Sequence, residues 1–283
     1  MITLQSTNHF SEGYVTTADN LKIYYKKLKP ENPTKNIIII PGFGATATMF
    51  LGMQHFFYEQ GYCAIIVELR GHGFSDGTPG HVEKHDDYLK DINAIIDNVN
   101  EKNIPTVICG HSNGGLVATN FAIKNQEKYE SLVLISPWYA LTKPLTWYEL
   151  ALVNLANQIF PKFTASMEDR GGLSSGCTTN TTWQNVLNVD KQIHKFASAR
   201  LNYEVQLTQQ YCFGNCSEIE NKNILIIHSK NDPVTSHESS LQMFGVLSRS
   251  QNKKFISLDK FIHHPFLEED VKSLFNDILN FIK

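Results

Sequence analysis

The sequence contains no long apolar segment, no excess of basic charge and no leader-like start. No run of 18 uninterrupted apolar residues is present, so we expect no transmembrane helix. The first residues carry neither a basic segment nor an apolar core, so we expect no secretory signal peptide and a cytoplasmic location. The formal net charge is −3 and the Lys and Arg residues are scattered, so we expect no nucleic-acid partner.

Nucleotide-binding glycine motifs and repeats are also missing. Neither G-x-x-x-x-G-K nor G-x-G-x-x-G occurs, and no internal repeat or low-complexity tract is visible. A disulfide among Cys177, Cys212 and Cys216 stays open, but reduced thiols fit the missing signal peptide better. His81 and His85 are four residues apart without an evident third ligand, so we expect no metal site, and no motif calls for a cofactor.

The chain is long enough for a large core, and its pattern is that of one α/β domain. At 283 residues, a sheet protein of this kind is commonly a single domain. Short apolar runs alternate with amphipathic helical patterns, which predicts a mostly parallel central sheet with helices on both faces. Residues 13–17 and 21–27 predict a hairpin. Further predicted strands are residues 36–40, 64–69, 106–109, 132–136, 224–228 and 254–258, and residues 88–99 predict a helix.

The segment Gly110-His111-Ser112-Asn113-Gly114 stands between a strand-like run and a helix-like run. A serine at such a strand-to-helix turn is the pattern of a nucleophile elbow, in which the turn strains the serine backbone and exposes its hydroxyl. The glycines omit side chains that would collide where strand and helix nearly touch. The segment alone also fits a glycine-rich loop with a surface serine. The flanking strand and helix favour the elbow, and we predict Ser112 as the nucleophile.

A serine nucleophile needs a base, which is commonly a histidine oriented by a carboxylate. In chains with this elbow, the acid follows the serine and the histidine follows the acid. Asp232 lies in the loop after residues 224–228, and we predict it as the acid. A turn-forming aspartate is the structural alternative, and Asp259 is a rival that lies closer to the histidine in sequence.

Two adjacent histidines, His263 and His264, follow the last predicted strand. Pro265 is suited to the first turn of the closing helix, which leaves His263 in the loop just before it. We therefore favour His263 over His264 as the base.

An oxyanion hole is expected after the first long buried strand, where the chain reads Pro41-Gly42-Phe43-Gly44. We predict that the backbone amide of Phe43 is one donor and that the amide of Asn113, directly after the nucleophile, is the second. An ordinary strand-to-helix turn is the structural alternative for this loop.

The alternation of strands and helices stops in residues 137–211, which are too many for a structureless loop. We interpret them as an insert that folds over Ser112 as a lid. Residues 145–160 are rich in aromatic and aliphatic side chains and predict a lid helix, with Trp147 and Leu150 in an acyl pocket and transient contact with a membrane surface. Simple packing of these residues onto the sheet remains an equal alternative. Residues 171–176 predict a lid hinge or a flexible connector.

Further segments of the chain carry motifs beside the elbow. They are Glu68-Leu69-Arg70-Gly71-His72-Gly73-Phe74-Ser75, similar to D-x-R-G-H-G-x-S; Gly80-His81-Val82; Gly110 to Gly115, similar to G-H-S-x-G-G; Ala199-Arg200-Leu201 with Glu204; and His263 with Pro265, Leu267 and Glu268, similar to H-x-P-x-L-E. Together these motifs resemble the α/β-hydrolase superfamily, and within it the monoacylglycerol lipase, lysophospholipase and serine aminopeptidase group. The resemblance implies an α/β-hydrolase fold with a helical lid inserted after the sixth strand. It also implies Ser112 as nucleophile, Asp232 as acid and His263 as base.

These residues predict a serine hydrolase that cleaves carboxylic esters through an acyl-enzyme, most simply monoacylglycerols or lysophospholipids. An esterase for small soluble esters and an aminopeptidase of the same fold remain alternatives, and a non-catalytic binding module is a third interpretation. The chain departs from the family pattern at Pro41, where histidine is usual, at Glu68, where aspartate is usual, and at Asn113. These departures affect the substrate more than the class of reaction.

Overall fold

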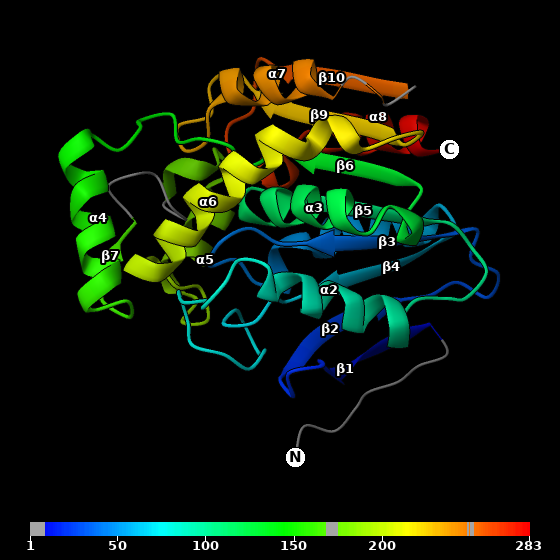
Figure 1. Cartoon of the computed structure of the whole chain (residues 1–283). Helices are drawn as coiled ribbons and strands as arrows, with labels where there is room; N and C mark the ends of the chain where they lie inside the picture. The colour runs from blue at the N-terminus through cyan, green and yellow to red at the C-terminus, as the bar shows by residue number, and fades with distance from the viewer. Residues whose placement is uncertain (1–8, 168–174, 248, 250–251) are drawn as a thin grey trace.

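A computed structural model describes residues 9–167, 175–247, 249 and 252–283, and its centre is an eight-stranded sheet (Figure 1). The strands lie in the order β1-β2-β4-β3-β5-β6-β9-β10. They are β1 (Phe10–Thr16), β2 (Lys22–Leu28), β3 (Lys35–Ile40), β4 (Tyr62–Val67), β5 (Thr106–His111), β6 (Ser131–Ile135), β9 (Asn223–Ser229) and β10 (Asn252–Leu258). Each predicted strand has its counterpart, shifted by a few residues at most.

The sheet is mostly parallel, as predicted. β1 and β2 form the antiparallel hairpin, and β2 runs antiparallel to β4. From β4 to β10 all neighbouring strands are parallel. Parallel neighbours require crossover connections, so their carboxyl ends meet at one edge of the sheet. Functional residues that follow these strands are therefore brought together at that edge.

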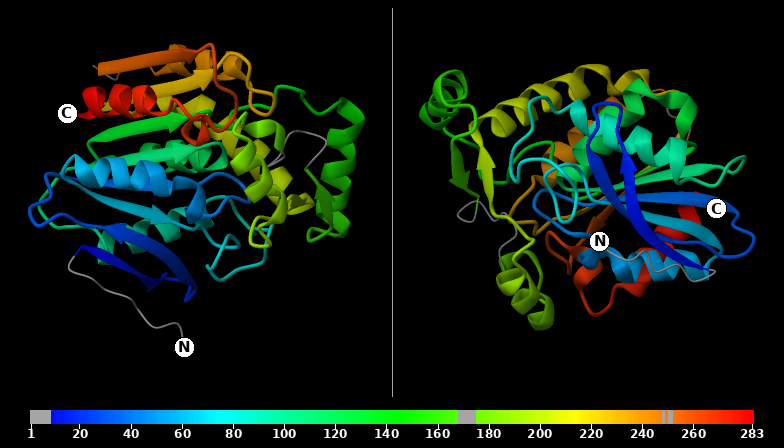
Figure 2. Two further views of the ribbon diagram at one scale, coloured as in Figure 1. Left: turned by 180° about the vertical axis from the view of Figure 1, so that it is seen from behind. Right: turned by 90° about the horizontal axis from the view of Figure 1, so that it is seen from below.

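Helices cover both faces of the sheet (Figures 1 and 2). α1 (Leu51–Glu59) and α8 (Lys272–Ile282) pack on one face, and α2 (Asp87–Asn98), α3 (Asn113–Lys124), α6 (Ala199–Asn215) and α7 (His237–Val246) pack on the other. Strand β3 shows why both faces are apolar. Ile38 and Ile40 join the core on the α3 side, and Ile37 and Ile39 join the core on the α1 side.

The segment between β6 and β9 holds additional elements beyond the carboxyl edge of the sheet, at the left in Figure 1. These are α4 (Trp147–Ile159), β7 (Thr164–Ser166), α5 (Thr181–Val189) and β8 (Phe196–Ser198), followed by α6. The predicted end of the insert at residue 211 falls inside α6, because this helix continues along α3 and helps to cover the sheet. Of the predicted hinge, residues 171–174 lie outside the described residues, and Ser175 and Gly176 begin a short 3-10 helix.

The closing helix differs from the expectation in its start. Pro265 begins a separate 3-10 helix, η6 (Pro265–Leu267), and α8 starts only at Lys272. The reason is Glu268, whose backbone is extended and whose carboxylate accepts hydrogen bonds from the amide and the hydroxyl of Thr179. With Glu268 held in this extended conformation, the backbone cannot continue as a helix from η6 into α8. In the described ranges, no helix is long and apolar enough to cross a bilayer.

Candidate active site

Ser112 occupies a strained turn between β5 and α3. Its backbone has φ 53° and ψ −120°, a left-handed φ that is uncommon for a residue other than glycine. The glycines on either side permit this turn. A Cβ on Gly110 would lie 2.3 Å from the carbonyl oxygen of Gly114, and a Cβ on Gly114 would lie 2.2 Å from that of Ile40. The local sequence therefore forces the serine out at the carboxyl edge of the sheet.

The structure brings together the three residues predicted as a triad. His263 Nε2 lies 3.1 Å from Ser112 Oγ, and His263 Nδ1 lies 2.8 Å from Asp232 Oδ2. All three residues are buried, with exposed fractions of 7% for Ser112, 5% for Asp232 and 3% for His263. Because the carboxylate only accepts hydrogen bonds, it keeps the proton of the imidazole on Nδ1. The lone pair on Nε2 is then directed at the serine hydroxyl, which is what proton abstraction requires.

The charge of Asp232 is stabilised by its surroundings. Burial by itself raises the pKa of this carboxyl, but the adjacent His263 and His228 outweigh burial and hold the pKa well below its usual value. The other carboxylate oxygen, Oδ1, accepts the amide hydrogens of Val234 and Thr235 at 2.8 and 2.9 Å. The carboxylate is thus ionised and fixed in orientation at neutral pH.

His228 is a neighbour of the triad that the sequence analysis did not single out. Its Nε2 lies 3.2 Å from Asp232 Oδ2 and 3.0 Å from the carbonyl oxygen of Thr235, and its Nδ1 lies 2.8 Å from Ser240 Oγ. The side chain is fully buried at the end of β9. His228 therefore contacts the same carboxylate oxygen, Oδ2, that His263 contacts. Its only signal in the sequence is its position, four residues before Asp232.

The two rival residues occupy different environments. Asp259 is largely exposed and pairs with Lys230 at 2.8 Å. His264 is buried beside the triad, and its backbone amide donates to the carbonyl oxygen of Cys177. In the described part of the chain, neither ring nitrogen of His264 has a hydrogen-bond partner. The structure thus brings Asp232 and His263, rather than these neighbours, into the chain of hydrogen bonds to Ser112.

The predicted oxyanion donors flank the serine. The loop after β3 approaches Ser112 so closely that a Cβ on Gly42 would lie 2.9 Å from Ser112 Cβ. Asn113 is the first residue of α3, where backbone amides have no partner within the helix. Within the described residues, the amides of Phe43 and Asn113 donate to no backbone carbonyl. Both are therefore suited to a developing negative charge on a substrate oxygen.

The side chain of Asn113 is itself held in place. Its Oδ1 lies 3.3 Å from Nε2 of His85, a histidine whose pKa is lowered to about 4 by burial. A neutral His85 can donate from Nε2 to this oxygen. His81 instead lies 2.9 Å from Ser198 Oγ, so the pair His81 and His85 does not converge on a common ligand position.

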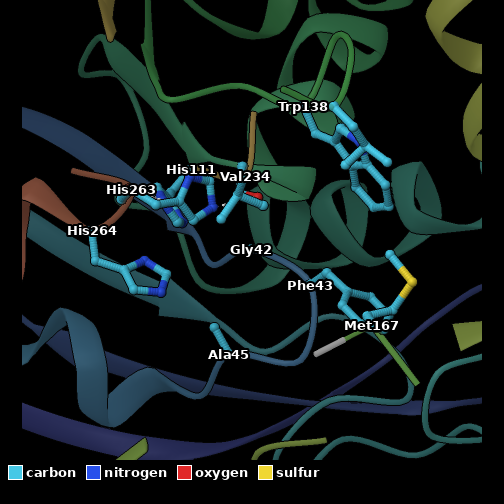
Figure 3. Close-up of a pocket in the computed structure, with 11 residues that line it drawn as sticks. Gly42, Phe43, Ala45, His111, Trp138, Met167, Val234, His263 and His264 are labelled. Atoms are coloured by element: carbon cyan, nitrogen blue, oxygen red, sulfur yellow. Dashed lines mark hydrogen bonds between the residues drawn. The ribbon is translucent and has the colours of Figure 1, made fainter. Parts of the chain in front are cut away.

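A narrow pocket of about 30 Å³ lies directly over Ser112. Figure 3 shows the histidines on one side of it and the apolar side chains of Phe43, Trp138 and Met167 on the other. A second cavity of about 400 Å³ shares Leu141 and Met167 with this pocket. Its remaining lining is largely apolar and comes mainly from α4 and the β7–α6 region: Leu145, Glu149, Leu152, Val153, Ala156, Phe163, Ala165, Ser166, Ala197, Ala199 and Asn202.

The two predicted lid residues have separate positions on α4. Glu149, Leu152, Val153 and Ala156 share one helical face and line the larger cavity. Trp147 precedes Glu149 by two residues, about 200° around the helix, and is 81% exposed. The structure therefore does not bring Trp147 into the cavity. Leu150 lines a smaller adjoining cavity together with Trp138 and Leu141.

Comparison with known proteins identifies the family of the chain. Residues 31–270 match the hydrolase family described as serine aminopeptidase, S33, and the chain belongs to this family. It is 22% identical over 252 residues to phospholipase YtpA of Bacillus subtilis, covering 87% of this chain and 94% of that protein. It is 24% identical over 266 residues to an uncharacterised abhydrolase domain-containing protein of Dictyostelium discoideum, covering 93% of this chain but only 27% of that protein.

The fold is also that of solved lipase structures. A soluble variant of monoglyceride lipase from Saccharomyces cerevisiae, in complex with a substrate analogue, matches with a TM-score of 0.83 at 19% identity, covering 99% of this chain and 97% of that chain. This likeness, with the sheet order and the helices on both faces, confirms the predicted α/β-hydrolase fold. The protein is a hydrolase of this fold.

Proposed function

We propose that the protein is a serine esterase that hydrolyses monoacylglycerols or lysophospholipids through an acyl-enzyme on Ser112. One observation carries the proposal: the hydrogen-bonded chain from Asp232 through His263 to Ser112 lies in a pocket that adjoins a large apolar cavity. The names of the phospholipase and the monoglyceride lipase to which the chain is similar support the same class of substrate.

In the proposed reaction, each step is carried out by a residue of this site. His263 Nε2 takes the proton of Ser112 while Oγ bonds to the ester carbonyl carbon, and the carbonyl electrons move to the oxygen. The amides of Phe43 and Asn113 stabilise that oxyanion, each donor contributing roughly 3 kcal/mol in comparable sites. The intermediate expels the alcohol, which takes its proton from His263. Water, deprotonated by the same imidazole, then attacks the acyl-enzyme and releases the fatty acid.

The larger cavity is the proposed site of the acyl chain. It is lined by aliphatic and aromatic side chains, with Glu149 as its only carboxylate among the described lining residues. Each methylene that leaves water for such a surface contributes about 0.8 kcal/mol. Leu141 and Met167 line both spaces, so the proposed path of the acyl chain from Ser112 runs past these two side chains.

The narrow space at Ser112 favours a second candidate, an esterase for small soluble esters. The pocket over Ser112 has a volume of only about 30 Å³, which suits a small acyl group better than a long chain. An aminopeptidase has less support, because a substrate ammonium group needs a carboxylate and none is present among the described residues that line this pocket.

We further propose that the outer face of α4 contacts lipid aggregates. Trp147, Tyr148, Leu155 and Ile159 are each more than half exposed on this helix, and Phe160 directly follows it. Aromatic and aliphatic side chains on an exposed helical face are suited to the boundary between lipid headgroups and acyl chains. This face is separate from the cavity-lining face that contains Val153.

A panel of soluble esters of increasing acyl length tests the substrate. Wild type should show kcat/KM that increases by orders of magnitude from acetyl to long acyl esters, and Ser112→Ala should abolish all turnover and labelling by a fluorophosphonate.

Val153→Asp places a charge in the cavity and should remove the preference for long chains while acetyl ester hydrolysis persists. Trp147→Asp, on the outer face, is the matched control and should keep the preference with monomeric esters but reduce turnover of vesicle-bound substrate. A wild type that prefers acetyl esters over every longer chain would establish the second candidate.

A further inference from the structure

Three buried imidazoles form a triangle beside Ser112. His111 ends β5, and His263 and His264 precede η6. The ring centroids are 4.8 Å apart for His111 and His263, 5.0 Å for His111 and His264, and 4.9 Å for His263 and His264. The three residues are 1–3% exposed, and all line the pocket over Ser112 (Figure 3). The triad uses only one of the three rings.

Some ring nitrogens of these three histidines have hydrogen-bond partners and others have none. His111 Nε2 lies 2.9 Å from the carbonyl oxygen of His263 and donates to it, which leaves Nδ1 as a lone pair. In the described chain, Nδ1 of His111 and both nitrogens of His264 have no hydrogen-bond partner. Gly42 keeps the space in front of His111 clear, since a Cβ there would lie 3.0 Å from Nδ1. Buried polar atoms without partners are costly, so their persistence here requires an explanation.

We propose that His111, His263 and His264 bind a transition-metal cation of the Zn²⁺ class and that the bound cation inhibits the enzyme. One ring nitrogen from each histidine lies within 4.8 Å of the other two. Tetrahedral zinc with bonds of 2.0–2.1 Å needs ligand atoms about 3.3 Å apart, so the rings must approach by about 1.5 Å at most. Ser112 Oγ, at 3.1 Å from His263 Nε2, already has the separation required of the fourth ligand.

Two of the three histidines have the orienting partner that is typical of zinc ligands. A histidine ligand usually donates its second ring nitrogen to a carboxylate or a backbone carbonyl, which orients the ring. His263 does so to Asp232, and His111 does so to the backbone of His263.

Inhibition follows from the atoms involved. The cation accepts the lone pair of His263 Nε2, which is the pair that otherwise takes the serine proton. Coordination of Ser112 Oγ releases its proton to solvent, and the negative charges of the alkoxide and of Asp232 compensate the two positive charges of the metal. Neither base nor nucleophile is then available to an ester.

The test measures binding and inhibition separately. Co²⁺ added to the metal-free protein should give the intense visible absorption of tetrahedral cobalt, and buffered Zn²⁺ should displace it. Zn²⁺ should also inhibit hydrolysis of a soluble ester, and a chelator should restore the rate. His264→Phe removes one ligand in an aromatic environment and should raise the half-inhibiting Zn²⁺ concentration by at least about tenfold, relative to its own metal-free rate. His55→Phe, an exposed histidine on α1, is the control and should leave that concentration unchanged.

A second measurement needs no variant and holds even if His264→Phe does not fold. Wild type phosphonylated on Ser112 has lost the fourth ligand and should bind Co²⁺ at least tenfold more weakly, without the tetrahedral spectrum. An unchanged cobalt spectrum after phosphonylation, or equal inhibition of wild type and His264→Phe, would overturn the proposal. The inhibition assay rests on the proposed hydrolase function, whereas the cobalt spectrum of the unlabelled protein does not, so the two failures are distinguishable.

Discussion

Among single residues, Asp232 has the most constrained role in the site. Its carboxylate accepts hydrogen bonds from two backbone amides and from the hydroxyl of Thr235, and it contacts the rings of His228 and His263. The side chain is nevertheless fully buried. A carboxylate at this depth is tolerated only because every acceptor position is used. Its main effect is on His263, because it determines which ring nitrogen holds the proton.

Asp232→Asn should therefore reduce kcat by about 10⁴-fold, as the same change does in other Ser-His-Asp sites. The asparagine amide can donate to Nδ1 and so stabilises the tautomer that has no lone pair at Ser112. Steady-state hydrolysis of a soluble ester at pH 7.5 measures the loss. Asp259→Asn, which alters only an exposed pair with Lys230, should keep kcat within about twofold. The reverse ranking would assign the acid to Asp259.

At the scale of elements, the contact between β3, β5 and α3 depends on the absence of side chains. Gly110 faces the carbonyl of Gly114, and Gly114 faces the carbonyls of Ile40 and Pro41. These are backbone atoms, which cannot rotate away as a flexible side chain does. Helix α3 thus begins directly beside the loop that follows β3, and its first amide lies next to Ser112.

Gly114→Ala should separate α3 from β3 and reduce both stability and turnover, since its Cβ would lie 2.2 Å from a carbonyl oxygen. We expect a loss of at least about 2 kcal/mol in the free energy of unfolding, measured by urea denaturation. Gly214→Ala is the matched control, because this glycine lies inside α6 with no neighbouring atom within 4 Å of its Cβ position. It should stabilise the protein by roughly 0.5–1 kcal/mol. Equal effects of the two changes would contradict this account of the elbow.

For the whole molecule, buried neutral histidines connect stability to pH. Burial is the largest cause that lowers the pKa of five histidines, which are His72, His85, His111, His194 and His264. The pKa is lowered to about 4 for His85 and to about 3 for His194. The unfolded chain takes up protons below about pH 6.5 while these rings in the folded state do not, so stability falls as the pH falls. Asp91 acts in the opposite direction, because burial raises its pKa to about 6 and the folded state then takes up a proton that the unfolded chain does not. This uptake offsets at most one of the protons that the unfolded chain gains on its histidines.

His85 and His194, whose pKa values are about 4 and about 3, should each remove roughly 1 kcal/mol from the free energy of unfolding between pH 6.5 and pH 5.5, and the lowered pKa values of His72, His111 and His264 act in the same direction. Asp232 adds nothing in this window, because its lowered pKa affects stability only as the pH falls below about 4. Urea denaturation at pH 7.5, 6.5 and 5.5 should give a falling midpoint with an unchanged m-value. In His85→Gln the slope should be smaller by about one proton equivalent. Stability that is constant from pH 7.5 to 5.5 would show that the folded protein protonates these rings.

Much of the fold and part of the site were predictable because their causes are local in the chain. Buried parallel strands are continuous apolar runs, and such runs predict the central strands β3, β4, β5, β6 and β9, whereas the hairpin of β1 and β2 follows from the turn between them. The elbow is a property of five consecutive residues. The predicted roles of Ser112, Asp232, His263, Phe43 and Asn113 follow from their positions after particular strands, and the structure brings these residues to one edge of the sheet.

Other features depend on contacts between distant segments. The sequence alone determined a mostly parallel sheet and a serine at a strained turn, since hydrophobic period and glycine stereochemistry act over a few residues. Only the tertiary structure decided that Trp147 faces outward while Val153 faces the cavity. Likewise, it decided that α8 begins after Glu268, which contacts Thr179, and that His228 contacts Asp232. It also decided the triangle of His111, His263 and His264, because the ends of non-consecutive strands meet only when the whole sheet has packed.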